Sequence, residues 1–200
     1  MALGLDWPAY CRFIDNLGPV TTRVLEALYD SATSQIMAVA LLLGFIGRPK
    51  RLAEFMGCLV LTGVVAIVTG AIIPALGAHH AYGMNTTAPF VSEIVAAHAG
   101  RVDRIDIVHM QGLVTFPSYH TVISIQIIVA TWRLRLIGPV MAIINAARLV
   151  GVPIFGSHHF IDMIGGGVLA GLVTWLWRVR FAEPTTEKAP AAAAARASAV

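Results

Sequence analysis

Five apolar runs, separated by shorter polar stretches, dominate the pattern of residues along this chain. Each run is close to the ~20 apolar residues that a membrane-spanning helix requires. The pattern therefore predicts an all-α integral membrane protein, built as a bundle of about five transmembrane helices. The runs lie at Ser31–Gly47, Phe55–Leu76, Pro117–Trp132, Leu136–Phe155 and Phe160–Trp177.

An interfacial segment is expected before the first run, over residues 1–30. Apolar residues recur at helical spacing from Tyr10 to Leu17, which is typical of a helix lying in the headgroup layer. Pro19 is expected to end that helix, because proline lacks the backbone donor that a helix interior needs. Tryptophan marks membrane interfaces, and we assign that role to Trp7, Trp132, Trp175 and Trp177.

Smaller features are expected outside the runs. In the long loop of residues 77–116, the pattern predicts a short amphipathic helix at Ser92–Ala99. Residues 183–200 are rich in Ala and Pro, which predicts a disordered cytoplasmic tail and leaves residues 31–182 as the transmembrane domain.

The composition supports a membrane protein. Hydrophobic residues make up 57% of the chain and charged residues 12%, and the mean hydropathy is +0.75. One soluble core could not hide so much apolar surface. The net charge of +3 is small, and nothing in the sequence indicates nucleic-acid binding.

The basic residues indicate the orientation. They gather at three places that share one side of the membrane if the runs alternate in direction, and this side is expected to be cytoplasmic. The three places are Arg48-Lys50-Arg51, Arg133-Arg135 and Arg178-Arg180. We therefore expect a multi-pass protein of the plasma (inner) membrane.

Helix packing has to hold this fold together. Cys11 and Cys58 are the two cysteines, too few for a disulfide framework. In the last run, Gly167 and Gly171 form a small-xxx-small pair that would let a neighbouring helix approach closely.

Two short polar clusters, around His120 and around His158, lie at the mouths of apolar runs on the expected outer face. Ionisable groups at a membrane edge cost free energy unless they pair or take part in chemistry. Asp162 follows His158 by about one helical turn, so its carboxylate can hold one imidazole nitrogen and leave the other free to attack. His120 could protonate a departing alkoxide, while Ser118 and free helix amides could hold phosphate oxygens. This combination favours phosphoryl transfer.

Pro117-Ser118-Tyr119-His120 resembles the PSxH motif of the type 2 phosphatidic acid phosphatase superfamily, and His158 to Asp162 resembles the HxxxD end of its third motif. Phe116 and Thr121 bring the chain closest to the branch that contains inositol phosphorylceramide synthases. The resemblance implies a membrane lipid phosphatase that needs no metal ion or cofactor. It also implies that His158 forms a phosphohistidine, that Asp162 orients it, and that His120 protonates the leaving group.

The cations of the family are where this chain departs from the pattern. The family has an Arg six residues before the nucleophile, where this sequence has Val152. Arg148 is the nearest substitute, one helical turn earlier. Arg101 and Arg104, in the outer loop, could supply further positive charge for the phosphate. The first family motif has only an Arg48-Pro49 echo, on the expected cytoplasmic side, and we reject it.

Alternative interpretations remain open. The expected substrate is a phospholipid or a polyprenyl phosphate, and an alcohol could replace water as acceptor, which would make the protein a phosphotransferase. His159 could also reach Asp162. Paired buried His and Asp could instead relay protons in a transporter, but such sites usually lie at the membrane midplane between repeats. A metal site is disfavoured because the outer-loop histidines lack ligand spacing: they are His79, His80, His98 and His109. The oligomeric state is not indicated.

Overall fold

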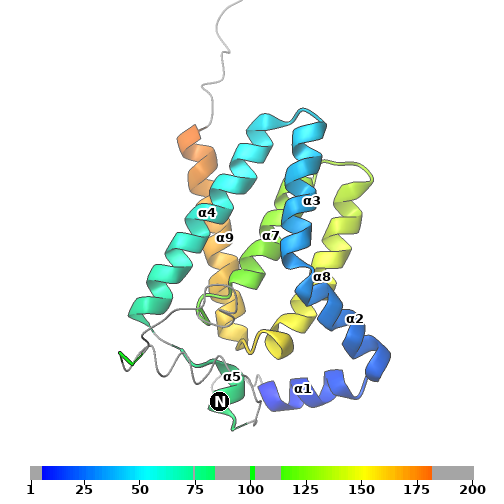
Figure 1. The fold of residues 1–200 in the computed structure, drawn as a ribbon, viewed down its shortest axis with the longest axis vertical. Helices are drawn as coiled ribbons and strands as arrows, with labels where there is room; N and C mark the ends of the chain where they lie inside the picture. Colours follow the sequence, from blue (N-terminus) through cyan, green and yellow to red (C-terminus); the bar gives the residue numbers. More distant parts are fainter. Residues whose placement is uncertain (1–5, 74, 84–99, 102–113, 182–200) are drawn as a thin grey trace, which may run out of the picture.

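The chain forms a bundle of α-helices, and the computed structural model describes residues 6–73, 75–83, 100–101 and 114–181 (Figure 1). These residues contain helices and no strand, so the all-α prediction is confirmed. The expected Ser92–Ala99 helix and the tail of residues 183–200 lie outside the described residues. The helices are α1 (Trp7–Asp15), α2 (Pro19–Asp30), α3 (Ala32–Phe45), α4 (Pro49–Ile72), α5 (Gly77–Ala81), α7 (Tyr119–Thr131), α8 (Ile137–Phe155) and α9 (Phe160–Phe181).

Three helical stretches are long and apolar enough to cross a membrane: the one that contains α4, and the helices α8 and α9. Helices α2 and α3 pass the same test only together, with a bend of 53° between them. Helix α7 is apolar but has only 13 residues. Of the five expected spans, three therefore stand alone, the first is half of a bent pair, and the third is a short helix.

The outer faces of the long helices are apolar. On α4, Val60 and Ile67 are exposed, and on α9 Ile164 and Val168 are exposed. Exposed apolar area on this scale is unusual on a soluble monomer and is what contact with lipid requires.

Helix α7 is the centre of the bundle and packs against α3, α4, α8 and α9. It is surrounded by protein, so its length need not match the thickness of the lipid. Its buried Gln126 donates to Thr174 Oγ1 at 3.0 Å and to the Ala170 carbonyl at 3.3 Å, both on α9. Buried polar groups are stable when they are paired in this way. These bonds hold the middle of α7 against α9.

Pro19 was expected to end the helix before it, but it begins α2 instead. Helix α1 already ends at Asp15, and Gly18 makes the turn with φ +92°, a conformation that favours glycine. Proline suits the first turn of a helix, where no backbone donor is needed. Helix α2 packs along α8.

The division of the chain at residues 30 and 182 stays a prediction.

The close approach of α9 to α7 is at Gly166 and not at the expected pair Gly167 and Gly171. A Cβ at Gly166 would overlap the carbonyl oxygen of Ser118, whereas Gly171 has nothing within 4 Å and Gly167 meets only the tip of the Ile125 side chain. The expected spacing was one residue out of register, and a helix turns by 100° per residue.

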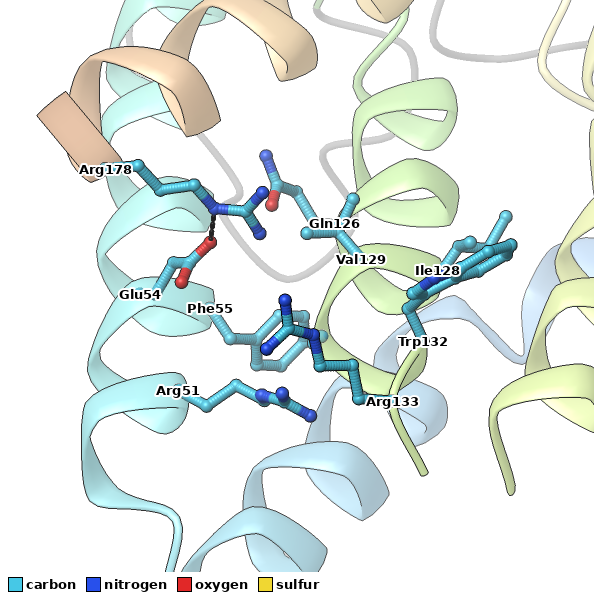
Figure 2. A pocket seen from close by; sticks show the side chains of 10 residues that line it. Arg51, Glu54, Phe55, Gln126, Ile128, Val129, Trp132, Arg133 and Arg178 are labelled. Carbon is cyan, nitrogen blue, oxygen red and sulfur yellow. Dashed lines mark hydrogen bonds and ion pairs between the residues drawn. The ribbon is translucent and has the colours of Figure 1, made fainter. Parts of the chain in front are cut away.

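The two ends of the bundle differ in chemistry. The start of α4 and the ends of α7 and α9 lie at one end, where Arg178 and Glu54 form an ion pair of 2.7 Å between α9 and α4 (Figure 2). The start of α7, the α8–α9 loop, α1 and α5 lie at the opposite end (Figure 1). Both histidine clusters belong to this second end.

Candidate active site

The loop between α8 and α9 carries His158, and two other segments hold its backbone. Ser157 has φ +52°, in the left-handed region that side chains rarely adopt. Its carbonyl accepts a hydrogen bond of 2.7 Å from the Ala78 amide, and its hydroxyl accepts one of 2.9 Å from the His79 amide. At Gly77, a Cβ would come within 2.8 Å of the Ser157 hydroxyl. The start of α5 therefore clamps the loop and stabilises its strained residue.

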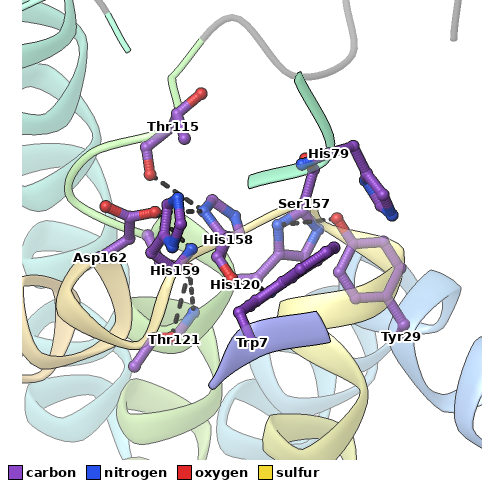
Figure 3. A network of polar contacts seen from close by, with 11 residues as sticks. Trp7, Tyr29, His79, Thr115, His120, Thr121, Ser157, His158, His159 and Asp162 are labelled. Atoms are coloured by element: carbon purple, nitrogen blue, oxygen red, sulfur yellow. Dashed lines mark hydrogen bonds and ion pairs between the residues drawn. The ribbon is translucent and has the colours of Figure 1, made fainter. Parts of the chain in front are cut away.

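Trp7, in α1, provides the second clamp. Its indole Nε1 donates a hydrogen bond of 3.0 Å to the carbonyl oxygen of His158 (Figure 3). The ring is stacked on Tyr82, with 5.4 Å between centroids. Trp7 is 0% exposed, whereas Trp132 is 70% exposed. The expectation that Trp7 marks the membrane interface is therefore wrong, because this indole is buried against the loop.

The imidazole of His158 has a defined hydrogen-bonding state. Its Nδ1 lies 2.9 Å from the carbonyl oxygen of Thr115 (Figure 3). A carbonyl can only accept, so Nδ1 carries the proton and Nε2 keeps its lone pair. Burial lowers the pKa of His158 to about 4, although the hydrogen bond to Thr115 opposes part of this change. Near neutral pH the ring is therefore neutral, with Nε2 available as a nucleophile.

Asp162 lies next to His158 but makes its hydrogen bond elsewhere. Its Oδ2 is 3.9 Å from Nδ1 of His158 and accepts a 2.7 Å bond from the backbone amide of His159. A carboxylate in the first turn of α9 that reaches back to this amide caps the helix. The hydrogen bond with Nδ1 of His158 was expected of Asp162, but the carbonyl of Thr115 makes it. Asp162 remains close enough to interact electrostatically with the imidazole.

His120 lies in the first turn of α7 and faces the same region. The His120 and His158 ring centroids are 6.2 Å apart. Tyr29 of α2 stacks on His120 with 4.2 Å between centroids, and its hydroxyl lies 3.3 Å from Nδ1 of His120. Tyr29 therefore occupies one ring nitrogen and leaves Nε2 for a ligand.

Ser118 joins the two clusters, which lie far apart in the sequence. Its amide donates a 2.9 Å hydrogen bond to the carbonyl oxygen of Asp162. Its hydroxyl caps α7, where it accepts from the amide and the hydroxyl of Thr121 at 3.4 and 3.2 Å. In this arrangement the Ser118 oxygen stabilises the helix start, and its phosphate-binding role stays a prediction.

Arg148 of α8 lies behind His120. It is 0% exposed, and its Nη2 donates a 2.9 Å hydrogen bond to the carbonyl oxygen of His120. Its Nε and Nη1 are buried without a hydrogen-bond partner among the described residues. Buried donors of a cation are costly unless an anion or acceptor meets them. Arg148 also shares a helix face with Val152, four residues on, where the resemblance places an Arg.

Of the two further cations that the sequence suggested for the phosphate, the structure describes one. Arg101 is exposed, and Arg104 lies outside the described residues. Arg48 precedes α4, at the end of the bundle away from the histidines.

A cavity of about 100 Å³ lies between the two histidines. Tyr29, Thr115, His120, Ser157 and His158 are among the residues that line it. Among the described residues, no group of three His, Cys, Asp or Glu side chains could hold a metal ion.

Four residues of this site had no site role predicted from the sequence: Trp7, Tyr29, Thr115 and Ser157. Thr115 acts through its backbone, which no motif records. Ser157 belonged to the polar cluster around His158 but was given no role there, and Tyr29 had no local signal of its own. Trp7 was visible only as an aromatic residue near a membrane surface, and its partner is 151 positions away.

Fold and site together define a helical membrane protein with two histidines at one buried cavity. A family model described as the PAP2 superfamily matches residues 1–176. The chain therefore belongs to the PAP2 superfamily, and this membership supports a phosphatase- or phosphotransferase-type activity. Comparison with curated proteins and comparison with solved structures found no match.

Proposed function

We propose that this chain is a metal-independent membrane phosphatase that hydrolyses a lipid phosphate or diphosphate through a phosphohistidine at His158. The observation that carries the proposal is the protonation state of the His158 imidazole. Its Nδ1–H is held by the Thr115 carbonyl at 2.9 Å, and its neutral Nε2 is left for attack beside a cavity that His120 also lines.

The separation of the two rings suits an in-line displacement. An in-line displacement needs the nucleophile and the proton donor on opposite sides of one phosphoryl group. The two rings line the same cavity, with 6.2 Å between their centroids. In the first step, His120 takes up a proton as the phosphate anion binds beside it. Nε2 of His158 then bonds to phosphorus, the bond to the alkoxide breaks, and His120 gives that proton to the alkoxide. In the second step, His120 takes a proton from water, whose oxygen displaces His158.

Arg148, with two unpaired buried donors, would stabilise the charge that develops on the phosphoryl oxygens. Its guanidinium does not line the cavity as it stands, so a bound phosphoryl group has to reach past His120. Ser118, Arg101 and Arg104 would add further contacts to phosphate. Asp162 would favour the charged forms of His158 that arise during the reaction, from its position at 3.9 Å.

We place the site on the extracytoplasmic face of the plasma (inner) membrane. This proposal is supported by the basic residues, which gather at the opposite end of the bundle from the histidines.

The experiment is turnover of a lipid phosphate by purified protein in the presence of a chelator. Wild type should release free phosphate and, after acid-free quenching, carry a base-stable, acid-labile phosphoryl group. His158→Ala should lose both, whereas His159→Ala, its matched neighbour, should keep both. Turnover that survives His158→Ala or vanishes with the chelator would contradict the proposal.

The acceptor is decided in the same assay. Closeness to the inositol phosphorylceramide synthase branch stays a prediction, and transfer to an alcohol uses the same residues. Adding inositol or a lipid alcohol and measuring a new phospholipid against free phosphate separates a phosphotransferase from a hydrolase.

A further inference from the structure

A second, larger cavity lies at the opposite end of the bundle from the histidines. It measures about 500 Å³ and lies between α4, α7 and α9 (Figure 2). Arg51, Arg133 and Arg178 line it, one from each of these helices or its end. The proposed phosphatase chemistry makes no use of it.

The charges of this cavity are not balanced. Arg178 is paired with Glu54 at 2.7 Å. Arg51 and Arg133 form no ion pair or hydrogen bond within the part of the chain that the structure describes, and both line the same hollow. Two like charges that face one cavity repel each other, and an anion between them would turn that repulsion into attraction.

Arginine is the cation best suited to a phosphate anion. Its planar guanidinium presents several donors in a fork that matches two phosphate oxygens at once. Two such groups, one on α4 and one just after α7, can bind one phosphate from two directions. An approach from two sides gives a site geometric selectivity that scattered surface charges lack.

The rest of the cavity indicates what the phosphate is attached to. Phe55 is buried beneath it, and Ile128 and Val129 contribute apolar wall. Trp132, 70% exposed, stands at the rim. A tryptophan in such a place is typical of the membrane–water interface. A ligand with an anionic head and an apolar continuation fits these surroundings better than a fully solvated ion.

We propose that this cavity binds the phosphate of an anionic phospholipid, from the leaflet opposite the histidine cavity. Arg51 and Arg133 bind the phosphate oxygens, and Trp132 lies at the level of the headgroup. None of the residues that line it also lines the histidine cavity, so binding here can be measured without turnover. Inorganic phosphate offers the same oxygens without the acyl chains, so it serves as the comparison ligand.

The test compares two double variants of the full chain in neutral detergent. Arg51→Gln with Arg133→Gln removes the two unpaired cavity charges. Arg48→Gln with Arg135→Gln removes the same charge from exposed positions at the same end, outside the cavity. Thermal unfolding is measured against added phosphatidylglycerol, phosphatidylcholine and inorganic phosphate, together with the lipid concentration that gives half of the shift.

Phosphatidylglycerol should raise the unfolding midpoint of wild type and of the exposed-site control, and phosphatidylcholine should not. The cavity variant should need at least tenfold more phosphatidylglycerol for the same shift. Equal weakening of both double variants would assign the effect to general surface charge and overturn the proposal. Stabilisation by phosphatidylcholine, or by inorganic phosphate to the same extent, would overturn the lipid assignment.

Discussion

The indole of Trp7 and the carbonyl of His158 are joined by a 3.0 Å hydrogen bond across 151 positions of sequence. The bond ties the N-terminal helix to the backbone of the proposed nucleophile. Trp7 is fully buried, so no water can replace its indole as donor without rearrangement. Helix α1 therefore belongs to the site.

Trp7→Phe keeps an aromatic ring against Tyr82 but removes the donor. Loss of this hydrogen bond frees the backbone of His158 to move out of its reactive position. A loss of about 1–1.4 kcal/mol corresponds to a kcat that is lower by a factor of roughly five to ten. We expect KM to change little, because Trp7 does not line the cavity. The measurement is kcat and KM of Trp7→Phe. The control is Trp175→Phe, which changes an exposed tryptophan on α9. A lower unfolding midpoint with unchanged kcat would make Trp7 purely structural.

The titration of His158 should be displaced to acid pH. Burial disfavours the charged imidazolium, so the pKa falls to about 4 and the ring binds its proton only as the pH approaches that value. Because the unfolded chain binds this proton near pH 6.5, the neutral ring stabilises the fold above that pH, and the stabilisation is lost as the pH falls toward 4.

Nitrogen NMR of histidine-labelled protein can follow this ring, with the signal assigned by its absence in His158→Ala. Between pH 7 and 5 we expect a neutral ring protonated at Nδ1. Titration of that signal near pH 6.5 would show that the imidazole is not buried as described.

Arg148→Gln should weaken binding of the phosphoryl group. Hydrogen bonds to charged groups contribute about 1.5–3 kcal/mol, so we expect at least a tenfold higher inhibition constant for inorganic phosphate or vanadate. Arg23→Gln, an exposed arginine on α2, is the matched control and should leave the constant unchanged. A fall in kcat alone, with phosphate affinity intact, would mean that Arg148 only holds the His120 carbonyl.

Gly166→Ala and Gly171→Ala form a matched pair on one helix. At Gly166 the added methyl group overlaps the Ser118 carbonyl, whereas at Gly171 it meets open space. Overpacking costs about 1–3 kcal/mol, so Gly166→Ala should lower the unfolding midpoint and the activity together. Gly171→Ala should be neutral or stabilising, because alanine favours helix by about 1 kcal/mol over glycine. Equal midpoints for the two variants would contradict the packing of α7 on α9.

The helical architecture followed from the sequence because long apolar runs are a local property. The runs at Leu136–Phe155 and Phe160–Trp177 correspond closely to α8 and α9. The run at Phe55–Leu76 identified α4 but missed its start at Pro49, because the basic residues there interrupt the apolar pattern while the backbone continues as helix. Periodicity does not report the bend of 53° between α2 and α3, or the packing of α2 along α8.

The sequence by itself identified His120, His158 and Asp162 as candidate site residues. Ionisable side chains at the ends of apolar helices cost free energy unless they pair or take part in chemistry. Only the tertiary structure decided how they are held. The Nδ1 partner of His158 is a backbone carbonyl at Thr115, the ring of His120 rests on Tyr29, and Arg148 lies beneath it. These contacts join segments that are far apart in sequence, and every residue has a carbonyl, so their selection depends on packing in three dimensions and not on residue type.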